Sequence, residues 1–349
     1  MKGNEAVAEA AIRAGADAYF GYPITPQSEV LEYLMAEKPH ERTGMVVLQA
    51  ESEVAAINMV YGGAGCGKKV MTSSSSPGVS LKQEGISYIA GAELPCLIVN
   101  VVRGGPGLGT IQPGQSDYFQ STKGGGHGDY RLIVLAPASV QEMADFVDLG
   151  FELAFKYRNP AMILSDGAIG QMMEKVLLNP QKERSKELPE WATTGKTADR
   201  ERNIITSLDL DSNQQEAFNI KLQKKYREMQ EKEVRFESFQ CDDAEYLLVA
   251  YGTSARVSQK AIQMARAEGI KVGLLRPITL FPFPTAEIRR LADQVKGMLT
   301  VEMSAGQMVE DVRLSVNGKV PVEHFGRMGG IVPTAEEVVE NLKNKIIGG

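Results

Sequence analysis

The chain has 349 residues, of which 43% are hydrophobic and 23% are charged, and its formal net charge is −6. This length allows a large core and two domains, and the composition is ordinary for a soluble globular protein. An acidic chain argues against a surface for nucleic acid or for an anionic membrane.

The cysteines Cys66, Cys96 and Cys241 are too far apart in sequence for a CxxC pattern. The sequence therefore predicts no zinc site, iron–sulfur cluster or disulfide scaffold built from this chain alone. The first residues lack the apolar core of a signal peptide, and no run of about 18 apolar residues predicts a membrane span. We expect a reducing, cytoplasmic setting.

Helix and strand patterns alternate over residues 1–180. Helices are predicted at residues 3–14, 28–36, 53–61, 78–90 and 140–157, and strands at 18–21, 45–49, 69–73, 96–102, 130–136 and 160–165. This alternation is typical of an α/β domain with a parallel sheet and helices on both faces.

Residues 181–240 interrupt the alternation, because Glu, Lys, Arg and Gln dominate there. Residues 213–239 have the pattern of one long charged helix. The simplest interpretation is a charged linker followed by a solvated helix, and a binding tail is the alternative. A second, smaller α/β domain is predicted over residues 241–349, with strands at 245–251, 271–275, 299–302 and 320–325 and helices at 252–267, 306–316 and 335–346.

Thr25 lies between Pro23 and Pro26, directly after a predicted strand. The prolines fix φ and push the residues before them into extended conformations. A stiff loop at a strand end can present a hydroxyl group to a ligand. The alternative is a purely structural turn into the next helix, with Ser28 as its N-cap.

Glu53 opens a predicted helix of small residues. Burial in such a tightly packed helix keeps a carboxyl group protonated, so that it can donate a hydrogen bond to a ring nitrogen. The alternative is a solvated Glu stabilised by the helix dipole, and Glu51 competes for the same role. The nearby run Gly62–Lys69 nearly spells a P-loop, but it ends in Lys where Ser or Thr would contact Mg²⁺, so we expect no ATP site.

Arg103 follows a predicted buried strand and begins a glycine-rich loop. A cation at the carboxyl end of a parallel strand suits a carboxylate or phosphate, and a salt-bridged surface Arg is the alternative. His127 lies in a second glycine-rich stretch, residues 124–129, and is interpreted as structural because it has no evident triad or metal partner. That stretch is interpreted as a mobile lid or a subunit contact.

Together these motifs resemble the alpha subunit of the 2-oxoacid:ferredoxin oxidoreductases over nearly the whole chain. The matching motifs are YPITP (22–26), ESEVAAIN (51–58), RGGP (103–106), QSD (115–117), LRPITLFPFP (275–284), VEMSAGQ (301–307) and GRMGG (326–330). Their number and order make the resemblance specific. It implies that residues 1–180 form the pyrimidine-binding domain of a thiamine diphosphate enzyme and that residues 241–349 resemble the transketolase C-terminal domain.

The resemblance also implies a role for each candidate residue. Glu53 would hydrogen-bond the aminopyrimidine ring of the cofactor and help to remove the C2 proton of its thiazolium ring. Thr25 would hydrogen-bond the substrate, and Arg103 would hold its carboxylate. Tyr22 and Pro23 would contact the cofactor, with Pro23 against its ring.

The family's diphosphate and Mg²⁺ segment, Gly-Asp-Gly followed by paired Asn, is missing, because only Ser165-Asp166-Gly167 is present. The resemblance therefore implies that Mg²⁺, the diphosphate contacts and the iron–sulfur clusters belong to partner subunits, namely beta, gamma and a ferredoxin-like delta. The site would form at a subunit interface, this chain would hold no metal, and alone it would be inactive.

The implied reaction is the oxidative decarboxylation of a 2-oxo acid with coenzyme A to acyl-CoA and CO₂, with ferredoxin as electron acceptor. Residues 103–114 are similar to the branched-chain type, which uses 3-methyl-2-oxobutanoate, and the Ser-Thr-Gly-Leu-Pro-Thr pattern of the 2-oxoglutarate type is absent. The 2-oxoglutarate type, a non-catalytic scaffold subunit and a stand-alone decarboxylase stay open as alternatives.

Overall fold

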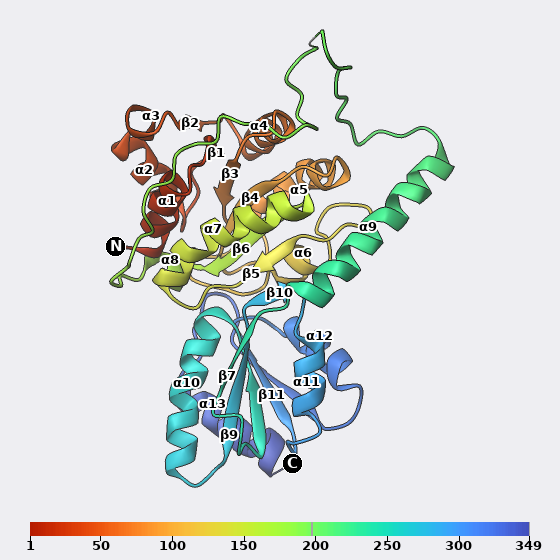
Figure 1. The fold of residues 1–349 in the computed structure, drawn as a ribbon. Coiled ribbons are helices and arrows are strands. Elements are labelled where there is room, and N and C mark those ends of the chain that lie inside the picture. Colours follow the sequence, from red (N-terminus) through yellow and green to blue (C-terminus); the bar gives the residue numbers. More distant parts are fainter. Residues whose placement is uncertain (197, 349) are drawn as a thin grey trace.

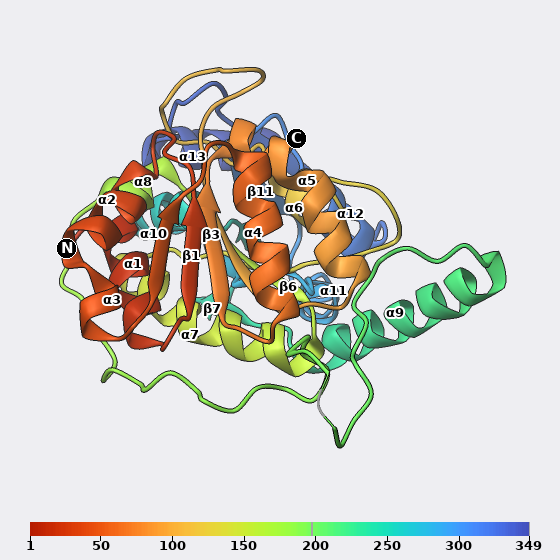
Figure 2. The same cartoon turned by 90° about the horizontal axis from the view of Figure 1, so that it is seen from above.

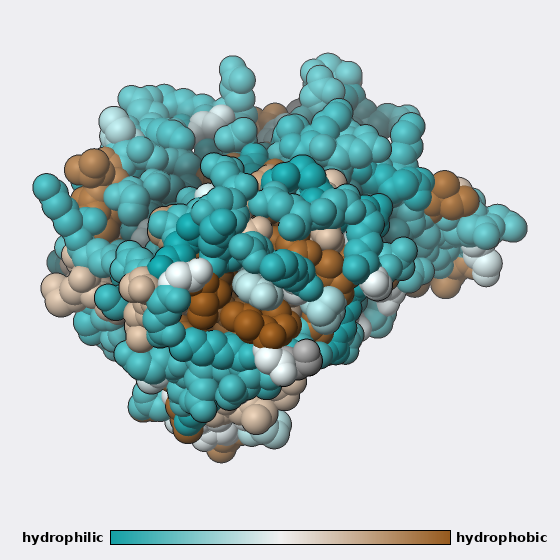
Figure 3. All heavy atoms as spheres, turned by 90° about the horizontal axis from the view of Figure 1, so that it is seen from below, coloured by the Kyte–Doolittle hydropathy of each residue, from teal (hydrophilic) through white to brown (hydrophobic). Residues whose placement is uncertain are grey.

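The computed structural model describes residues 1–196 and 198–348; residues 197 and 349, which fall in the predicted linker and the predicted second domain, lie outside the described residues. Two sheets form the centres of two α/β units, one above the other in Figure 1. Seen from below, the molecular surface is mostly hydrophilic with separate apolar areas (Figure 3).

The first sheet has seven strands in the order β10–β5–β6–β4–β3–β1–β2. They are β1 (Ala18–Gly21), β2 (Val46–Gln49), β3 (Val70–Ser74), β4 (Cys96–Val102), β5 (Ile133–Leu135), β6 (Pro160–Asp166) and β10 (Thr279–Phe281). All neighbouring pairs except β5–β10 are parallel. The parallel α/β fold expected from the alternating pattern is therefore confirmed.

Helices cover the first sheet. They are α1 (Gly3–Arg13), α2 (Ser28–Glu37), α3 (Pro39–Arg42), α4 (Glu53–Gly65), α5 (Ser76–Gly91), α6 (Tyr118–Thr122), α7 (Val140–Tyr157) and α8 (Gly167–Gln171). Figure 2 shows β1 and β3 between α1 on one side and α4 on the other. Ser28 is the first residue of α2 and not its N-cap, because Gln27 holds that position.

The second sheet has five strands in the order β12–β11–β8–β9–β7. They are β7 (Phe236–Phe239), β8 (Tyr246–Val249), β9 (Val272–Pro277), β11 (Met298–Glu302) and β12 (Val322–Gly326). The helices of this half are α9 (Ser212–Lys232), α10 (Gly252–Ala267), α11 (Thr285–Leu291), α12 (Met308–Val316) and α13 (Ala335–Leu342), followed by a π-helical turn at Lys343–Ile347.

The predicted long helix at 213–239 is wrong beyond Lys232. The buried side chain of Glu233 accepts hydrogen bonds from Tyr157 and Lys156 at the end of α9, and β7 then pairs antiparallel with β9. The tertiary pairing of β7 outweighs the local helix propensity of a charged segment. The helix α9 itself projects away from both sheets (Figures 1 and 2).

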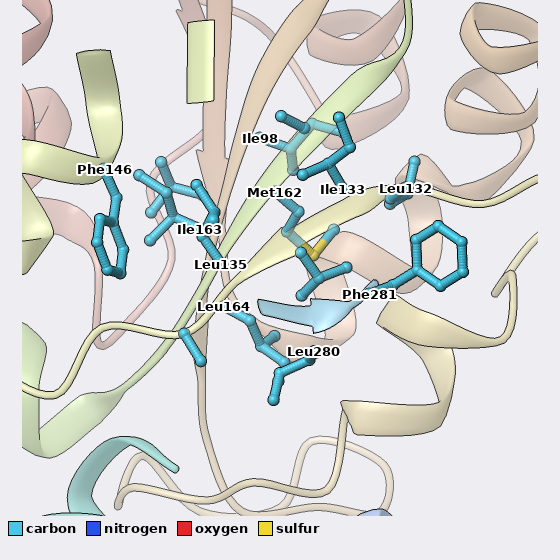
Figure 4. Close-up of a cluster of buried hydrophobic side chains, with 14 of the residues drawn as sticks. Ile98, Leu132, Ile133, Leu135, Phe146, Met162, Ile163, Leu164, Leu280 and Phe281 are labelled. Atoms are coloured by element: carbon cyan, nitrogen blue, oxygen red, sulfur yellow. The ribbon is translucent and has the colours of Figure 1, made fainter. Parts of the chain in front are cut away.

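One strand links the two units. β10 follows β9 in sequence but joins the first sheet antiparallel to β5. Its residues Leu280 and Phe281 are buried, and they lie among first-sheet side chains such as Ile133 and Met162 (Figure 4). The division into residues 1–180 and 241–349 stays a prediction, and the two sheets do not separate at a single point in the sequence.

The Gln115 side chain also connects the two units, through hydrogen bonds. Its buried side-chain amide donates to the Tyr251 carbonyl (2.9 Å) and accepts from the Ser254 hydroxyl (2.7 Å) and from the Met303 amide (2.9 Å). A buried amide with these partners fixes the relative position of the two units, because breaking the set would leave buried polar groups without hydrogen bonds.

Candidate functional site

The candidate residues lie at one edge of the first sheet, where parallel strands end. The loop with Thr25 follows β1, Glu53 comes shortly after β2, and Arg103 follows β4. The strands that carry them are neighbours through β3, and the Ala50 amide donates to the Gly21 carbonyl (2.8 Å). In parallel α/β sheets this edge is where ligands bind.

The proline-flanked loop is anchored from several sides. The Pro26 carbonyl accepts hydrogen bonds from the side chains of Asn4 (2.7 Å) and Gln171 (3.0 Å), and the Tyr22 carbonyl accepts one from Gln27 (3.2 Å). The Thr25 side chain is exposed and, within residues 1–196 and 198–348, forms no hydrogen bond. The loop thus presents a free hydroxyl group on a fixed backbone.

Below this loop lies a buried polar network. The Gln27 side chain accepts a hydrogen bond from the Ser73 hydroxyl, which lies 2.7 Å from the Tyr19 hydroxyl. Burial raises the pKa of Tyr19 to about 12, so this phenol stays neutral in the network. This network is not predictable from the sequence, because its members lie on different elements.

Arg103 is buried, with 7% of its surface exposed, and holds two loops together. One of its terminal nitrogens donates to the Thr25 carbonyl (3.0 Å) and the other to the Leu108 carbonyl (2.9 Å). Its Nε has no partner, and it forms no ion pair with any described residue. A buried guanidinium without a carboxylate partner has an uncompensated positive charge, which favours an anion nearby.

Glu53 is also buried, with 7% of its surface exposed, whereas Glu51 is exposed. Ser52 caps α4 by accepting a hydrogen bond from the Ala55 amide (3.2 Å), which sets Glu53 as the first helical residue. A Cβ added at Gly78 would lie 2.8 Å from Glu53 Oε1. Across the described chain, the Glu53 carboxyl group has no hydrogen-bond partner.

The first turn of α5 lies between Glu53 and Arg103. The Ser76 hydroxyl accepts from the Arg103 amide (3.2 Å) and lies 3.3 Å from the Arg103 carbonyl. Gly78, in the same turn, packs against Glu53. The structure therefore brings Thr25 and Arg103 into direct contact and places Glu53 across the same helical turn.

A cavity of about 1040 Å³ opens beside this turn. Its walls are the start of α5, the loop Gly104–Leu108, and the second-unit residues Met303–Gln307 and Met328–Gly329. The loops meet closely, because a Cβ added at Gly104 would lie 2.8 Å from the Gly330 amide nitrogen. Two glycine-rich motifs that are far apart in sequence thus form one wall.

Asp117 lies in the wall of this cavity. Its carboxylate accepts a hydrogen bond from Asn100 (2.9 Å), and burial raises the pKa of Asp117 above its ordinary value. Asp117 belongs to the motif QSD (115–117), which matches the family, but no role is predicted for it from the sequence.

Other residues singled out in the sequence have structural surroundings. Gly62–Gly65 form the last turn of α4, as expected for a helix end. Asp166 caps α8 and accepts a hydrogen bond from the Thr253 hydroxyl (2.8 Å) of the second unit. His127 is exposed near Tyr88 of α5, away from the candidate residues, with its amide donating to the Ser87 hydroxyl (3.1 Å).

No group of three or more His, Cys, Asp or Glu in the described part of the chain is placed to hold a metal ion. Among its helices, none is both long and apolar enough to span a membrane. The three cysteines are free, and Cys66 is exposed whereas Cys96 and Cys241 are buried.

Two family models match the chain. Residues 9–239 match the model described as "Pyruvate flavodoxin/ferredoxin oxidoreductase, thiamine diP-bdg". Residues 244–338 match "Pyruvate:ferredoxin oxidoreductase core domain II".

Curated relatives agree with these models. The chain is 53% identical over 343 residues to a ketoisovalerate oxidoreductase subunit VorB of Methanothermobacter thermautotrophicus, covering 98% of this chain and 96% of the relative. It is 36% identical over 374 residues to a 2-oxoglutarate synthase subunit KorA of Methanothermobacter marburgensis, covering 100% of this chain and 98% of the relative.

Solved structures share the fold. A 2-oxoglutarate:ferredoxin oxidoreductase from Magnetococcus marinus, with 2-oxoglutarate, coenzyme A and succinyl-CoA bound, superposes with a TM-score of 0.84 at 28% identity over 99% of this chain. The present chain spans 65% of that one. A split-gene transketolase, an inactive beta4 tetramer, has a TM-score of 0.64 at 14% identity, covers 99% and 98% of the two chains, and shows the fold alone.

The strand-end site, the two family models and the full-length relatives all lead to the same assignment. The chain belongs to the pyruvate flavodoxin/ferredoxin oxidoreductase family, that is, to the 2-oxoacid:ferredoxin oxidoreductases.

Proposed function

We propose that this chain is the alpha subunit of a ferredoxin-dependent oxidoreductase that converts a 2-oxo acid and coenzyme A to acyl-CoA and CO₂. It contributes the wall of the site that contacts the pyrimidine half of thiamine diphosphate and the substrate. The observation that carries this proposal is the largely buried Glu53 carboxyl group, which has no hydrogen-bond partner among the described residues and lies across the first turn of α5 from Arg103.

The residues fit the pyrimidine half of the cofactor. A largely buried carboxyl group without a protein partner is free to bind a ligand, and a ring nitrogen satisfies it by hydrogen bonding. Tyr22 and Pro23 lie at the surface of the same loop, where they can contact a ring. When bound, thiamine diphosphate supplies the carbanion chemistry and the electron sink for the reaction.

The remaining steps fall to side chains of this chain. Glu53 holds or donates the proton that the ring nitrogen exchanges. Arg103 attracts the carboxylate of the 2-oxo acid, while its hydrogen bond to the Thr25 carbonyl keeps the loop in place. The exposed Thr25 hydroxyl donates a hydrogen bond to the substrate.

We propose 3-methyl-2-oxobutanoate as the substrate. The 53% identity to a ketoisovalerate oxidoreductase subunit exceeds the 36% identity to a 2-oxoglutarate synthase subunit. The cavity beside Arg103 supports this choice, because Asp117 is the only charged side chain among the described residues that line it. A second substrate carboxylate, as in 2-oxoglutarate, would meet no cation there.

We propose further that Mg²⁺, the diphosphate contacts and the iron–sulfur clusters belong to partner subunits. The Asp166 carboxylate is the one acidic group of the Ser-Asp-Gly stretch. It already accepts hydrogen bonds from backbone amides of α8 and from Thr253. The partners are beta, gamma and a ferredoxin-like delta subunit, with ferredoxin as the acceptor. The free cysteines support a reducing compartment, the cytoplasm.

This chain offers a suitable docking surface for the beta subunit next to Glu53. The edge strand β2 is largely exposed, including Val46 and Leu48, and the exposed side of α4 carries Val54 and Met59. An exposed apolar edge strand is rare in a protein that stays alone. This face adjoins the start of α4, so a subunit docked there can complete the site.

The experiment is a comparison of Glu53→Gln with its neighbour Glu51→Gln in the complex co-purified with its partners. Replacing the Glu53 carboxyl group by an amide removes general acid–base assistance, which contributes about 100-fold or more to rate. We expect ferredoxin reduction with 3-methyl-2-oxobutanoate and coenzyme A to fall by that factor in Glu53→Gln and by less than about twofold in the exposed-site control.

Full activity of Glu53→Gln would overturn the catalytic role and favour the scaffold alternative. A panel of 2-oxo acids with a low-potential dye tests the substrate in the same preparation. Faster turnover of 2-oxoglutarate than of 3-methyl-2-oxobutanoate would overturn the substrate proposal and leave the reaction class intact.

A further inference from the structure

Lys82 is a lysine in the interior of the first unit, with 0% of its surface exposed. It lies on α5, and among the described residues its Nζ donates one hydrogen bond, to the Thr72 hydroxyl on β3 (3.1 Å). An ammonium group has three donors, and burial of a charge without an ion pair is costly. A methionine would fill the same space without that cost, so packing alone does not explain a lysine here.

The helix geometry directs Lys82 toward Glu53. Lys82 lies one turn after Gly78, on the same face of α5, and long helical side chains point back toward the helix N-terminus. Gly78 is the residue that packs against the Glu53 carboxyl group. Lys82 therefore leaves α5 on the face that packs against Glu53, and its ammonium group lies in the interior beside Thr72.

The electrostatic influences on Lys82 are consistent with this geometry. Burial lowers the pKa of Lys82 from 10.5 to about 8, and the negative charge of Glu53 acts in the opposite direction. Among the described residues, Glu53 on α4 is the charged group that acts on the pKa of Lys82, and the neighbour on β3, Thr72, is uncharged. The charge of Glu53 thus acts on the buried Lys82 ammonium group through the interior, without a direct ion pair between the two among the described residues.

We propose that Lys82 is a positioning residue for Glu53. Its ammonium group stabilises the Glu53 carboxyl group from the interior and leaves the other side of that group free for the cofactor ring. Lys82 contacts neither cofactor nor substrate and acts only through Glu53. This inference rests on the proposed function of Glu53.

The pairing is tested first in the full-length chain without partners or cofactor. Lysine is labelled with ¹³C at Cε, and the Lys82 signal is assigned by its loss in Lys82→Met. Glu53→Gln should lower the pH at which Lys82 titrates, because the stabilising negative charge is gone, and Glu51→Gln should leave it unchanged. An identical Lys82 titration in wild type and Glu53→Gln would overturn the inference.

The functional consequence is tested in the co-purified complex with Lys82→Met, Lys82→Gln and Lys82→Arg. We expect the two neutral variants to lower kcat and thiamine diphosphate affinity tenfold or more and Lys82→Arg to restore part of both. The matched control is Lys225→Met, which removes another largely buried lysine. Lys225 lies on α9 and forms an ion pair with Glu93 (3.2 Å). That control should keep wild-type kcat and affinity.

The outcomes separate the two claims. If Glu53→Gln inactivates the complex while both neutral Lys82 variants stay fully active, the positioning role is wrong and the proposed function stands. If Glu53→Gln stays active, the proposed function of Glu53 is wrong, whatever the titration of Lys82 shows. If the Lys82 variants unfold more readily but keep kcat and cofactor affinity, Lys82 is merely structural and the inference fails.

Discussion

Individual side chains of the site were predictable from the sequence only where they belong to a recognisable motif. Glu53 and Arg103 stood at strand ends in recognisable stretches, and the structure places both, buried, around the first turn of α5. Lys82 was not predictable, because a lysine inside a helix pattern looks like a solvated residue. Its burial depends on the packing of α5 against α4 and β3, which only the fold reveals.

A pH dependence of stability follows from Lys82. The native chain releases the Lys82 proton near pH 8, while the unfolded chain holds it until about pH 10.5. Between these values the unfolded state binds more protons, so the free energy of unfolding rises with pH. Lys82→Met lacks this contribution, which amounts to roughly 3 kcal/mol at most.

The measurement is urea unfolding of the wild-type chain and of Lys82→Met between pH 7.5 and about 10. The wild-type free energy should rise relative to that of the variant over this window. Taking the difference cancels the buried tyrosines, which titrate in both proteins. A difference that stays constant with pH would show that Lys82 titrates alike in the folded and unfolded chains.

At the scale of elements, local patterns predicted most helices and strands but not long-range pairing. The strands β1, β4 and β6 were clear from short apolar runs bounded by turn residues. The short strand β10 was missed, because Thr279–Phe281 becomes a strand only by pairing with β5 of the other unit. The end of α9 was misplaced for a related reason, since β7 is a strand only because β9 lies beside it.

Leu280→Ala tests the link that β10 makes. Leu280 is 1% exposed in the core of the first sheet, and removing such a buried side chain costs about 2–5 kcal/mol. Chemical unfolding should show that loss, whereas Leu210→Ala, at a residue that is 91% exposed, should change stability by less than about 0.5 kcal/mol. Equal stability of the two variants would mean that β10 is not part of the core.

At the scale of the whole molecule, we propose that the chain presents half of a site. Thr25, Glu53 and Arg103 surround one helical turn, the apolar edge at β2 lies next to them, and the described residues offer no metal cluster. The resemblance in sequence suggested this division, and the unpartnered Glu53 carboxyl group supports it. The shape of the proposed other half depends on a different polypeptide and so could not be predicted from this sequence.

The most direct test of this division is titration calorimetry of thiamine diphosphate with Mg²⁺ into the isolated chain and into the co-purified complex. We predict tight binding by the complex, binding weakened tenfold or more by Glu53→Gln in the complex, and no measurable binding by the isolated chain. Tight, Mg²⁺-dependent binding by the isolated chain would contradict the account, because this chain would then hold a complete cofactor site.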